Sequence, residues 1–148
     1  MNIAHLLIPK QNVAYLYEDF TIRQALEKMR RHGYSAIPVI NRTNQYVGSL
    51  SEGDLLWYLI DYQNGKPQKM SIKSLEKISV ADMLGEDKYP PARITATVSE
   101  LLNHALNQNF VPVIDDRDLF IGIVTRKDIL RSLCSADKNK KILSTLNT

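Results

Sequence analysis

The sequence has little cysteine and no long apolar run. Cys134 is the single cysteine among 148 residues, which excludes an internal disulfide and a cysteine-based zinc site and is typical of a reducing compartment. No apolar run approaches the roughly 18 residues of a membrane-spanning helix. The N-terminus MNIAHLLIPK also lacks the basic region of a signal peptide. We therefore expect a cytoplasmic protein that does not cross a membrane.

The chain also has only a small excess of positive over negative side chains. The chain has 19 Lys and Arg against 16 Asp and Glu, a formal net charge of +3. This excess is too small and too scattered to predict nucleic-acid binding. The three histidines lie far apart, and neither a Ser-His-Asp pattern nor a phosphate-binding G-x-x-x-x-G-K-[ST] loop occurs. We expect no metal site, no catalytic residues and no enzymatic activity.

The chain contains an internal repeat, first visible in two predicted helices. The segments TIRQALEKM and TVSELLNHA begin at Thr21 and Thr97 and carry apolar residues at positions i, i+3, i+4 and i+7. Each begins with a capping box, formed by Thr21 with Gln24 and by Thr97 with Glu100. The pattern predicts two equivalent amphipathic helices, each with one buried side.

The repeat continues through a predicted hairpin. PVINRTNQYVGSLSEGDLLWYL at 38–59 aligns without gaps with PVIDDRDLFIGIVTRKDILRSL at 112–133. A turn-rich tetrad interrupts each apolar stretch and indicates two hairpin strands followed by a helix. Upstream, NIAHLL aligns with SVADML as a short amphipathic turn, and a first short strand is expected near 13–17 and near 93–95.

These elements predict an α/β (α+β) fold made of two repeats. Each repeat is expected to form a three-stranded sheet with helices on one face. Since a unit of about 65 residues buries little core alone, the two should pack sheet to sheet about a pseudo-twofold axis. We assign residues 1–64 to repeat 1, 65–78 to a linker, 79–135 to repeat 2 and 136–148 to a C-terminal tail that would form a last helix.

The corner between hairpin and following helix has the same pattern in both repeats. Ser51 with Asp54, and Thr125 with Asp128, fit a helix cap with Asp in the third position. The same geometry suits a nucleotide: free N–H groups at a helix N-terminus bind phosphate, and a carboxylate accepts hydrogen bonds from ribose hydroxyls. Both interpretations stay open from the residues alone.

The two corners differ between these positions. Arg126 and Lys127 lie where the helix dipole disfavours cations, so capping does not require them, and they would instead supply positive charge to a phosphate. The first corner has Glu52 and Gly53 there. We therefore expect the pocket at the second corner to be the better anion site.

Adenine would need an apolar slot with backbone polar groups at its edge. The alternative role for the same residues is plain sheet core. The candidate slots are Val13, Ala14, Tyr34, Ser35, Ala36, Ile37 and Pro38 in repeat 1, and Ile94, Thr95, Phe110, Val111 and Pro112 in repeat 2.

The order of elements, the xxPVI strand and the twice-repeated G-h-h-[ST]-x-x-D-h-h corner (h, apolar) resemble a tandem pair of CBS domains, or Bateman module, over about residues 2–135. NVAYLYEDFTIRQALEKMRRHGYSAIPVI and NFVPVIDDRDLFIGIVTRK are similar to bacterial CBS-pair proteins that bind cyclic di-AMP. The resemblance implies that each slot faces the corner of the other repeat. The stronger site would then combine the repeat 1 slot with Thr125, Arg126, Lys127 and Asp128, and the weaker site the repeat 2 slot with Ser51 and Asp54.

This resemblance implies a stand-alone regulatory module that binds an adenine nucleotide and relays occupancy to an unidentified target protein, without another cofactor. Asp54 and Asp128 match the acids that AMP-, ADP- or ATP-binding CBS pairs use on the ribose. Cyclic di-AMP and AMP, ADP or ATP therefore stay open, with S-adenosylmethionine as a third option. The alternative is a protein-interaction module with vestigial pockets. A homodimer is expected, with Trp57, Tyr58 and Tyr62 as a candidate interface.

Overall fold

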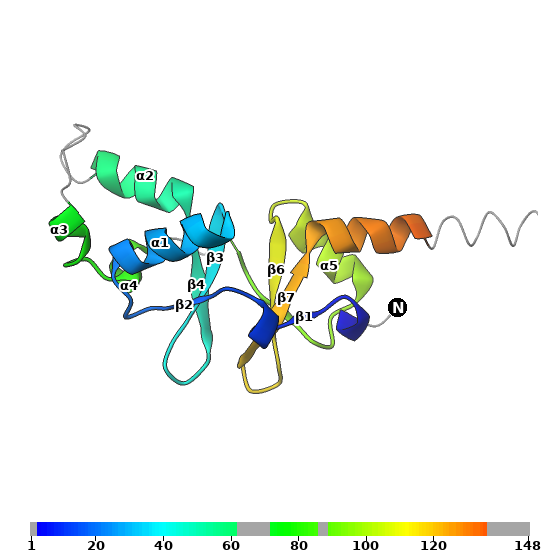
Figure 1. The fold of residues 1–148 in the computed structure, drawn as a ribbon. Helices are drawn as coiled ribbons and strands as arrows, with labels where there is room; N and C mark the ends of the chain where they lie inside the picture. Colours follow the sequence, from blue (N-terminus) through cyan, green and yellow to red (C-terminus); the bar gives the residue numbers. More distant parts are fainter. Residues whose placement is uncertain (1–2, 62–71, 86–88, 136–148) are drawn as a thin grey trace, which may run out of the picture.

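The computed structural model describes residues 3–61, 72–85 and 89–135, and both halves of the chain contain a short strand, a helix, a two-stranded hairpin and a second helix in the same order (Figure 1). The first half contains η1 (Ile3–His5), β1 (Ile8–Pro9), η2 (Lys10–Asn12), β2 (Leu16–Tyr17), α1 (Ile22–His32), β3 (Ala36–Ile40), β4 (Tyr46–Ser51) and α2 (Glu52–Asp61). The second contains α3 (Ile72–Leu75), α4 (Val80–Met83), β5 (Ala92–Arg93), α5 (Val98–Ala105), β6 (Phe110–Ile114), β7 (Phe120–Thr125) and a helix over 126–135. The predicted repeat is confirmed.

The two predicted hairpins form with matching registers. Val39 pairs with Gly48 in β3–β4, and Val113 pairs with Gly122 in β6–β7, each followed by a bulge. In the first turn the Asn41 side-chain oxygen accepts hydrogen bonds from the N–H groups of residues 43 and 45. Asp115 does the same in the second turn. Short polar side chains that replace backbone partners explain why both tetrads turn.

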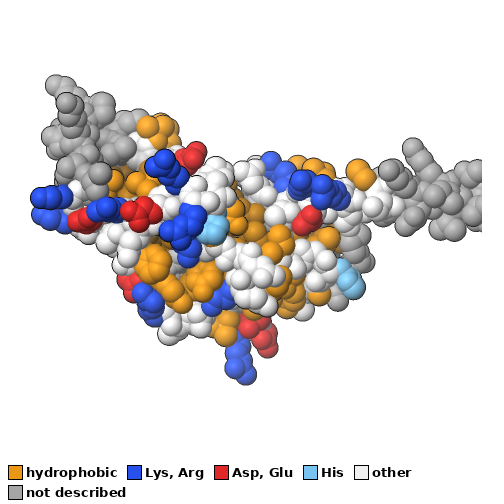
Figure 2. Space-filling model, in the orientation of Figure 1, with side chains coloured by type: hydrophobic (Ala, Val, Ile, Leu, Met, Phe, Trp, Pro, Cys, Tyr) orange, Lys and Arg blue, Asp and Glu red, His pale blue; other side chains and the backbone are white. Residues whose placement is uncertain are grey.

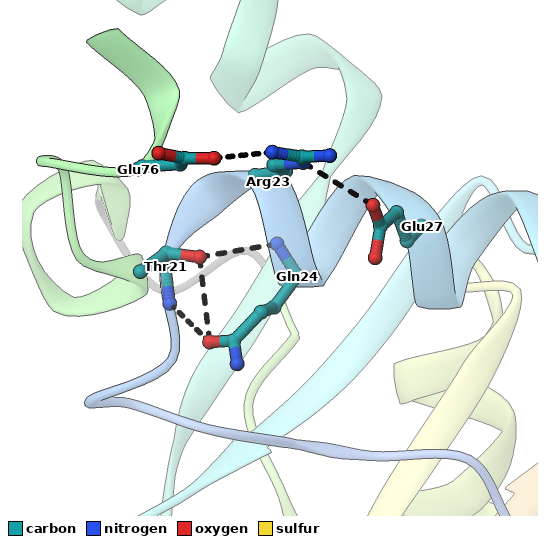
Figure 3. A network of polar contacts seen from close by, with 5 residues as sticks. All are labelled: Thr21, Arg23, Gln24, Glu27 and Glu76. Carbon is teal, nitrogen blue, oxygen red and sulfur yellow. Dashed lines mark hydrogen bonds and ion pairs between the residues drawn. The ribbon is translucent and has the colours of Figure 1, made fainter. Parts of the chain in front are cut away.

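The capping boxes at the start of α1 and α5 are also confirmed. Thr21 Oγ1 accepts from the Gln24 N–H at 3.2 Å, and Gln24 Oε1 accepts from the Thr21 N–H at 2.9 Å (Figure 3). Arg23 forms ion pairs with Glu27 on the same helix and with Glu76, just after α3 (Figure 3). The Arg23–Glu76 pair joins α1 to the segment that leads into the second half.

Each repeat lends its leading segment to the other repeat. Ile3 in η1 is buried in the core of the second sheet, whereas Val80 and Met83 in α4 are buried in the core of the first. Backbone hydrogen bonds hold α4 there, from the Val80 N–H to the Phe20 carbonyl at 2.8 Å and from the Ile22 N–H to the Ile78 carbonyl at 2.9 Å. Neither repeat therefore has a complete core of its own.

This exchange corrects the expected sheets and segments. The first sheet has three strands in the order β2-β3-β4, but the second has four, β1-β7-β6-β5, because β1 pairs antiparallel with β7. The sequence does not reveal β1, which has two residues. The short strands are β2 at Leu16–Tyr17 and β5 at Ala92–Arg93, and η1 is a 3-10 turn. The segment expected as a linker includes α3, whose Leu75 packs against the first core.

The two sheets pack against each other through a third cluster of buried side chains, as expected. Its fully or nearly buried members are Val13, Ala36, Ile40, Phe110, Phe120 and Ile123. Aromatic rings surround it; those of Tyr46 and Phe120 stack with centroids 6.2 Å apart. The Phe120 N–H also donates to the Asn44 carbonyl at 2.8 Å, which links the hairpin turns. Side chains from both repeats therefore meet at this interface.

Two expectations concern residues beyond these ranges. The C-terminal tail at 136–148 and Tyr62 lie outside the described residues. Within the described ranges, no helix combines the length and apolar character needed to cross a bilayer. The cytoplasmic location stays a prediction.

Candidate functional site

A cavity of about 290 Å³ opens between the two repeats, beside the central cluster. Figure 2 shows apolar side chains gathered in the middle of one face, between the two halves. Strands β3, β6 and β7 supply the cavity walls, and the chain between β1 and β2 supplies the rim. The lining residues are Ile8, Asn12, Val13, Gly33, Tyr34, Ser35, Ala36, Pro38, Asn109, Phe110, Ile123 and Thr125.

The cavity brings together much of the stronger site expected from the sequence. Val13 and the run from Tyr34 to Ala36, with Pro38, face Thr125 of the other repeat across it. Ala14 and Ile37 instead belong to the buried core of the first repeat, with Ile37 fully buried. Ile37 therefore has the role of sheet core, which was the alternative to a ligand-binding role. Ligand binding by the lining residues stays a prediction.

Five cavity-lining residues are not among the sites expected from the sequence: Ile8, Asn12, Gly33, Asn109 and Ile123. Ile8 and Asn12 lie on the leading segment that crosses to the second sheet, so their place depends on the unrecognised strand β1. Asn109 precedes β6 as Ser35 precedes β3, and both line the cavity. The alignment of the hairpins contained a signal for Asn109, since it pairs the two positions.

At the second corner, backbone and side chains make a well-defined helix start. The Asp128 N–H donates to Thr125 Oγ1 at 3.2 Å, and the Arg126 N–H donates to the Asn109 carbonyl at 2.9 Å. Arg126 Nε donates to the Ala105 carbonyl at 2.8 Å, at the end of α5. Carbonyls in the last turn of a helix lack internal partners, so this bond is structural. Lys127 is exposed.

The acids Asp54 and Asp128, each three residues after the hydroxyl residue of its corner, have different surroundings. Asp54 Oδ2 accepts from the Ser51 N–H at 2.9 Å while the Asp54 N–H donates to Ser51 Oγ at 3.1 Å, which completes a capping box. The Asp128 carboxylate accepts no hydrogen bond from the residues that the structure describes, and it borders a hollow next to His5 and Arg131. The first acid is engaged as a cap and the second is available to a ligand.

The weaker site expected from the sequence is arranged differently. Val111 is fully buried in the second core, Ile94 packs against that core, and Thr95 is exposed. Pro112 is buried in β6, and Phe110 lines the cavity and stacks on Tyr89. Of the expected slot, Phe110 is the member that contacts Tyr89, a residue sequence reasoning missed.

Strand registers show why Tyr89 matters. Leu16 pairs with Val39 and Ala92 pairs with Val113, so β2 and β5 are equivalent. Counting back three residues from each makes Tyr89, and not Ile94, the counterpart of Val13. Thr97 follows Thr21 by as many residues as Ala92 follows Leu16, so the alignment of the helices pairs Val13 with Tyr89 as well. The second slot was placed wrongly because the short strand of repeat 2 was expected at 93–95, after Tyr89.

Tyr89 lies within electrostatic reach of both corners. Burial is the main cause that raises the pKa of its phenol above the usual value; Arg126 opposes this rise and Asp54 adds to it. The ring of Tyr89 stacks on that of Phe110, with centroids 4.8 Å apart and planes at 25°. We call the cavity lined by Val13 and Ala36 the first cleft, and the equivalent region at Tyr89 and Phe110 the second cleft. The second cleft therefore holds an aromatic pair where the first has Val13 and Ala36.

No group of three or more His, Cys, Asp or Glu side chains that could hold a metal ion occurs within the described part of the chain. The cavity offers apolar walls and the Thr125 hydroxyl at a helix start. Arg126, Lys127 and Asp128 are not among its lining residues, and Asp128 borders a separate hollow. An apolar cavity with a few polar groups suits binding of a small polar-ended ligand.

The chain belongs to the CBS domain family, whose model matches residues 4–61 and 80–135. Cyclic di-AMP receptor B of Bacillus subtilis is 22% identical over 131 residues, 88% of this chain and 85% of that protein. The crystal structure of CbpB in complex with c-di-AMP is 26% identical, with a TM-score of 0.81 over 95% of this chain and 89% of that one. CBSX2 in complex with AMP, at 23% identity and a TM-score of 0.71 over 92% and 98%, is similar in fold.

Proposed function

We propose that this chain is a regulatory ligand-sensing module that binds an adenine nucleotide in the cavity between its repeats and relays occupancy to a partner protein. The cavity itself carries the proposal, because its walls come from both repeats. A ligand seated there touches β3 and β7 together. It would therefore favour one relative placement of the sheets, which regulation by a ligand requires.

The polar and apolar groups are distributed as a nucleotide needs. Val13, Ala36 and Ile123 offer apolar surface for a base, and Ser35 and Asn109 lie at the cavity for its polar edge. Thr125 starts the helix at 126–135, whose positive end suits a phosphate. The Arg126 guanidinium donates through Nε to the Ala105 carbonyl and keeps its charge, so it can add to the positive field of the helix start and of Lys127.

Two nucleotides have specific support. Cyclic di-AMP is supported by the likeness to CbpB and to the Bacillus subtilis receptor. AMP is supported by the free carboxylate of Asp128, because AMP has two neighbouring ribose hydroxyls to donate to it. In cyclic di-AMP the 3′ oxygens are esterified, so each ribose has one hydroxyl left. Catalysis is not part of the proposal.

The proposal is tested by titration calorimetry with cyclic di-AMP, AMP, ATP and S-adenosylmethionine, comparing the parent with Ala36→Phe. Phe is the residue at the equivalent position of repeat 2, so the β-strand tolerates it, and in β3 its ring would enter the cavity. We expect affinity to fall by about 100-fold, since a filled slot excludes the base. Ala36→Ser, which adds one atom, is the matched control and should bind within a few-fold of the parent.

Parent protein that binds none of the four ligands would overturn the proposal. It would favour the alternative of an interaction module whose pockets are vestigial. Equal binding by parent and folded Ala36→Phe would move the site away from this cavity. Circular dichroism and thermal unfolding show that each variant is folded.

A homodimer is part of the proposal and rests on exposed apolar side chains. Leu56 and Trp57 on α2 are 57% and 56% exposed, and Leu130 on the helix at 126–135 is 53% exposed. Leu56 and Leu130 are equivalent in the two repeats. Tyr58, a candidate for the same interface, instead packs partly against the first core. Analytical ultracentrifugation of Leu56→Glu beside the parent tests this surface: the variant should sediment as a monomer.

A further inference from the structure

The second cleft contains a side chain where a base would lie in the first. The counterparts of Val13 and Ala36 are Tyr89 and Phe110, and their rings stack in parallel at 4.8 Å. This spacing and the 25° angle are those of stacked aromatic pairs in general. A nucleotide base is also a flat aromatic group, so one stacked on Phe110 would need the space that Tyr89 fills.

Hydrogen bonds fix the backbone on both sides of this pair. The Tyr46 hydroxyl donates to the Tyr89 carbonyl at 2.7 Å. Gln108, 2% exposed, donates through Nε2 to the carbonyls of Pro90 and Phe110, both at 3.2 Å. A buried amide that bridges the two segments holds them in one relative position. Tyr89 is thereby kept over Phe110.

The acid of the same cleft is also occupied within the protein. Asp54 accepts from the Ser51 N–H, so a ribose hydroxyl would compete with the helix cap. Phe110 is 8% exposed, and Tyr89 is half-buried, within electrostatic range of this acid and of Arg126. The second cleft therefore has a filled base position beside an acid with one oxygen engaged in a helix cap, whereas the cavity lined by Val13 and Ala36 is open.

We infer that Tyr89 occupies the base position of the second cleft, so that each chain takes one nucleotide and not two. Tyr89 is then the residue that sets the stoichiometry, and its removal would create a second site on the face of Phe110. The inference rests on the proposed function for its ligand. It differs from that proposal in concerning the other cleft.

The test is the number of AMP molecules bound per chain, measured by titration calorimetry and by native mass spectrometry. The parent should bind one. Tyr89→Ala, which vacates the ring position, should bind two, the second at least ten-fold more tightly than any second event in the parent. Tyr89→Phe keeps the stacked ring and should still bind one. If Tyr89→Ala does not fold, Tyr89→Val, with the residue found at position 13, replaces it.

Two molecules bound to the parent, or one bound to the parent and one to folded Tyr89→Ala, would overturn the inference. The proposed function fails separately. If the parent binds no AMP while Tyr89→Ala binds one, the first cavity is not an AMP site but Tyr89 does block the second. If neither protein binds AMP, the inference falls, and titration of the parent with the other three ligands decides the proposed function.

Discussion

The two halves of this protein have the same backbone plan and unequal clefts. Both hairpins place a buried Pro-Val-Ile strand beside a strand that ends at a hydroxyl residue, and both following helices have Asp three positions later. The cleft with Val13 and Ala36 is open, whereas its counterpart with Tyr89 and Phe110 is filled. On our proposal, side-chain volume at two equivalent positions, and not the fold, decides which cleft can accept a ligand.

The largest difference between the halves is expected at a pair of equivalent glycines. Gly48 has φ +152° and Gly122 has φ +154°, so both adopt a conformation that strains any other residue. A Cβ at Gly122 would overlap the carbonyl oxygen of Ile8 in β1, whereas a Cβ at Gly48 would meet the Leu84 side chain at an ordinary 3.7 Å. Gly122→Ala should lower the free energy of unfolding by roughly 4 kcal/mol or more, and Gly48→Ala by about 1 to 3 kcal/mol.

Urea unfolding of the two variants measures this difference. The backbone strain is common to both positions. The larger loss of unfolding free energy at Gly122 therefore reports the close approach of β1. Equal losses would mean that β1 moves away at little cost. In that case Ile8 and Asn12 would be poor walls for the cavity.

β1 also shows where prediction from the sequence stopped. Periodicity, capping boxes and turn residues predicted α1, α5 and both hairpins, because each pattern is local. β1 has two residues, one of them Pro9, and its partner Ile123 lies more than a hundred positions away. No local pattern marks such a strand, nor the exchange of leading segments that it accompanies.

The candidate site was predictable to a similar degree. That Tyr34 to Ala36 would face Thr125 followed from family resemblance, and the cavity does bring them together. The bond from Arg126 to the Ala105 carbonyl was not predictable, because it depends on where α5 ends in space. Tyr89 was missed because the short strand of repeat 2 was expected at 93–95, although the alignment of the helices already pairs Val13 with Tyr89.

The next difference concerns the two acids. Asp128→Asn should weaken AMP binding by about 10- to 100-fold, since a hydrogen bond to a charged group contributes about 1.5 to 3 kcal/mol. Cyclic di-AMP, with one free hydroxyl per ribose, should lose less. Asp54→Asn should leave affinity unchanged, because its carboxylate is engaged with the Ser51 N–H. It should instead lower the free energy of unfolding by about 1 kcal/mol through loss of the cap.

Titration calorimetry with both nucleotides, paired with thermal unfolding, separates these effects. Equal affinity losses in the two variants would remove the distinction between a free and an engaged acid. If Asp128→Asn binds AMP as tightly as the parent, Asp128 serves as a helix-start residue alone, and support for AMP over cyclic di-AMP disappears.

The smallest expected difference concerns stability at alkaline pH. The second cleft contains the titratable Tyr89, whereas the first has Val13 at the equivalent position. Burial, and to a lesser extent Asp54, raise the pKa of Tyr89 above 10.0, against Arg126. A raised folded-state pKa means that the stabilisation from the neutral phenol is fully present below pH 10 and is lost as pH rises through the folded-state value. Tyr89→Phe removes this loss, so its melting temperature should fall less steeply above pH 10 than that of the parent. Tyr15, whose pKa burial also raises, keeps part of the slope in both proteins, and Tyr15→Phe is the matched control. If the melting temperatures of Tyr89→Phe and the parent fall equally steeply above pH 10, the phenol of Tyr89 reaches solvent. Tyr89 would then not stay in its half-buried position.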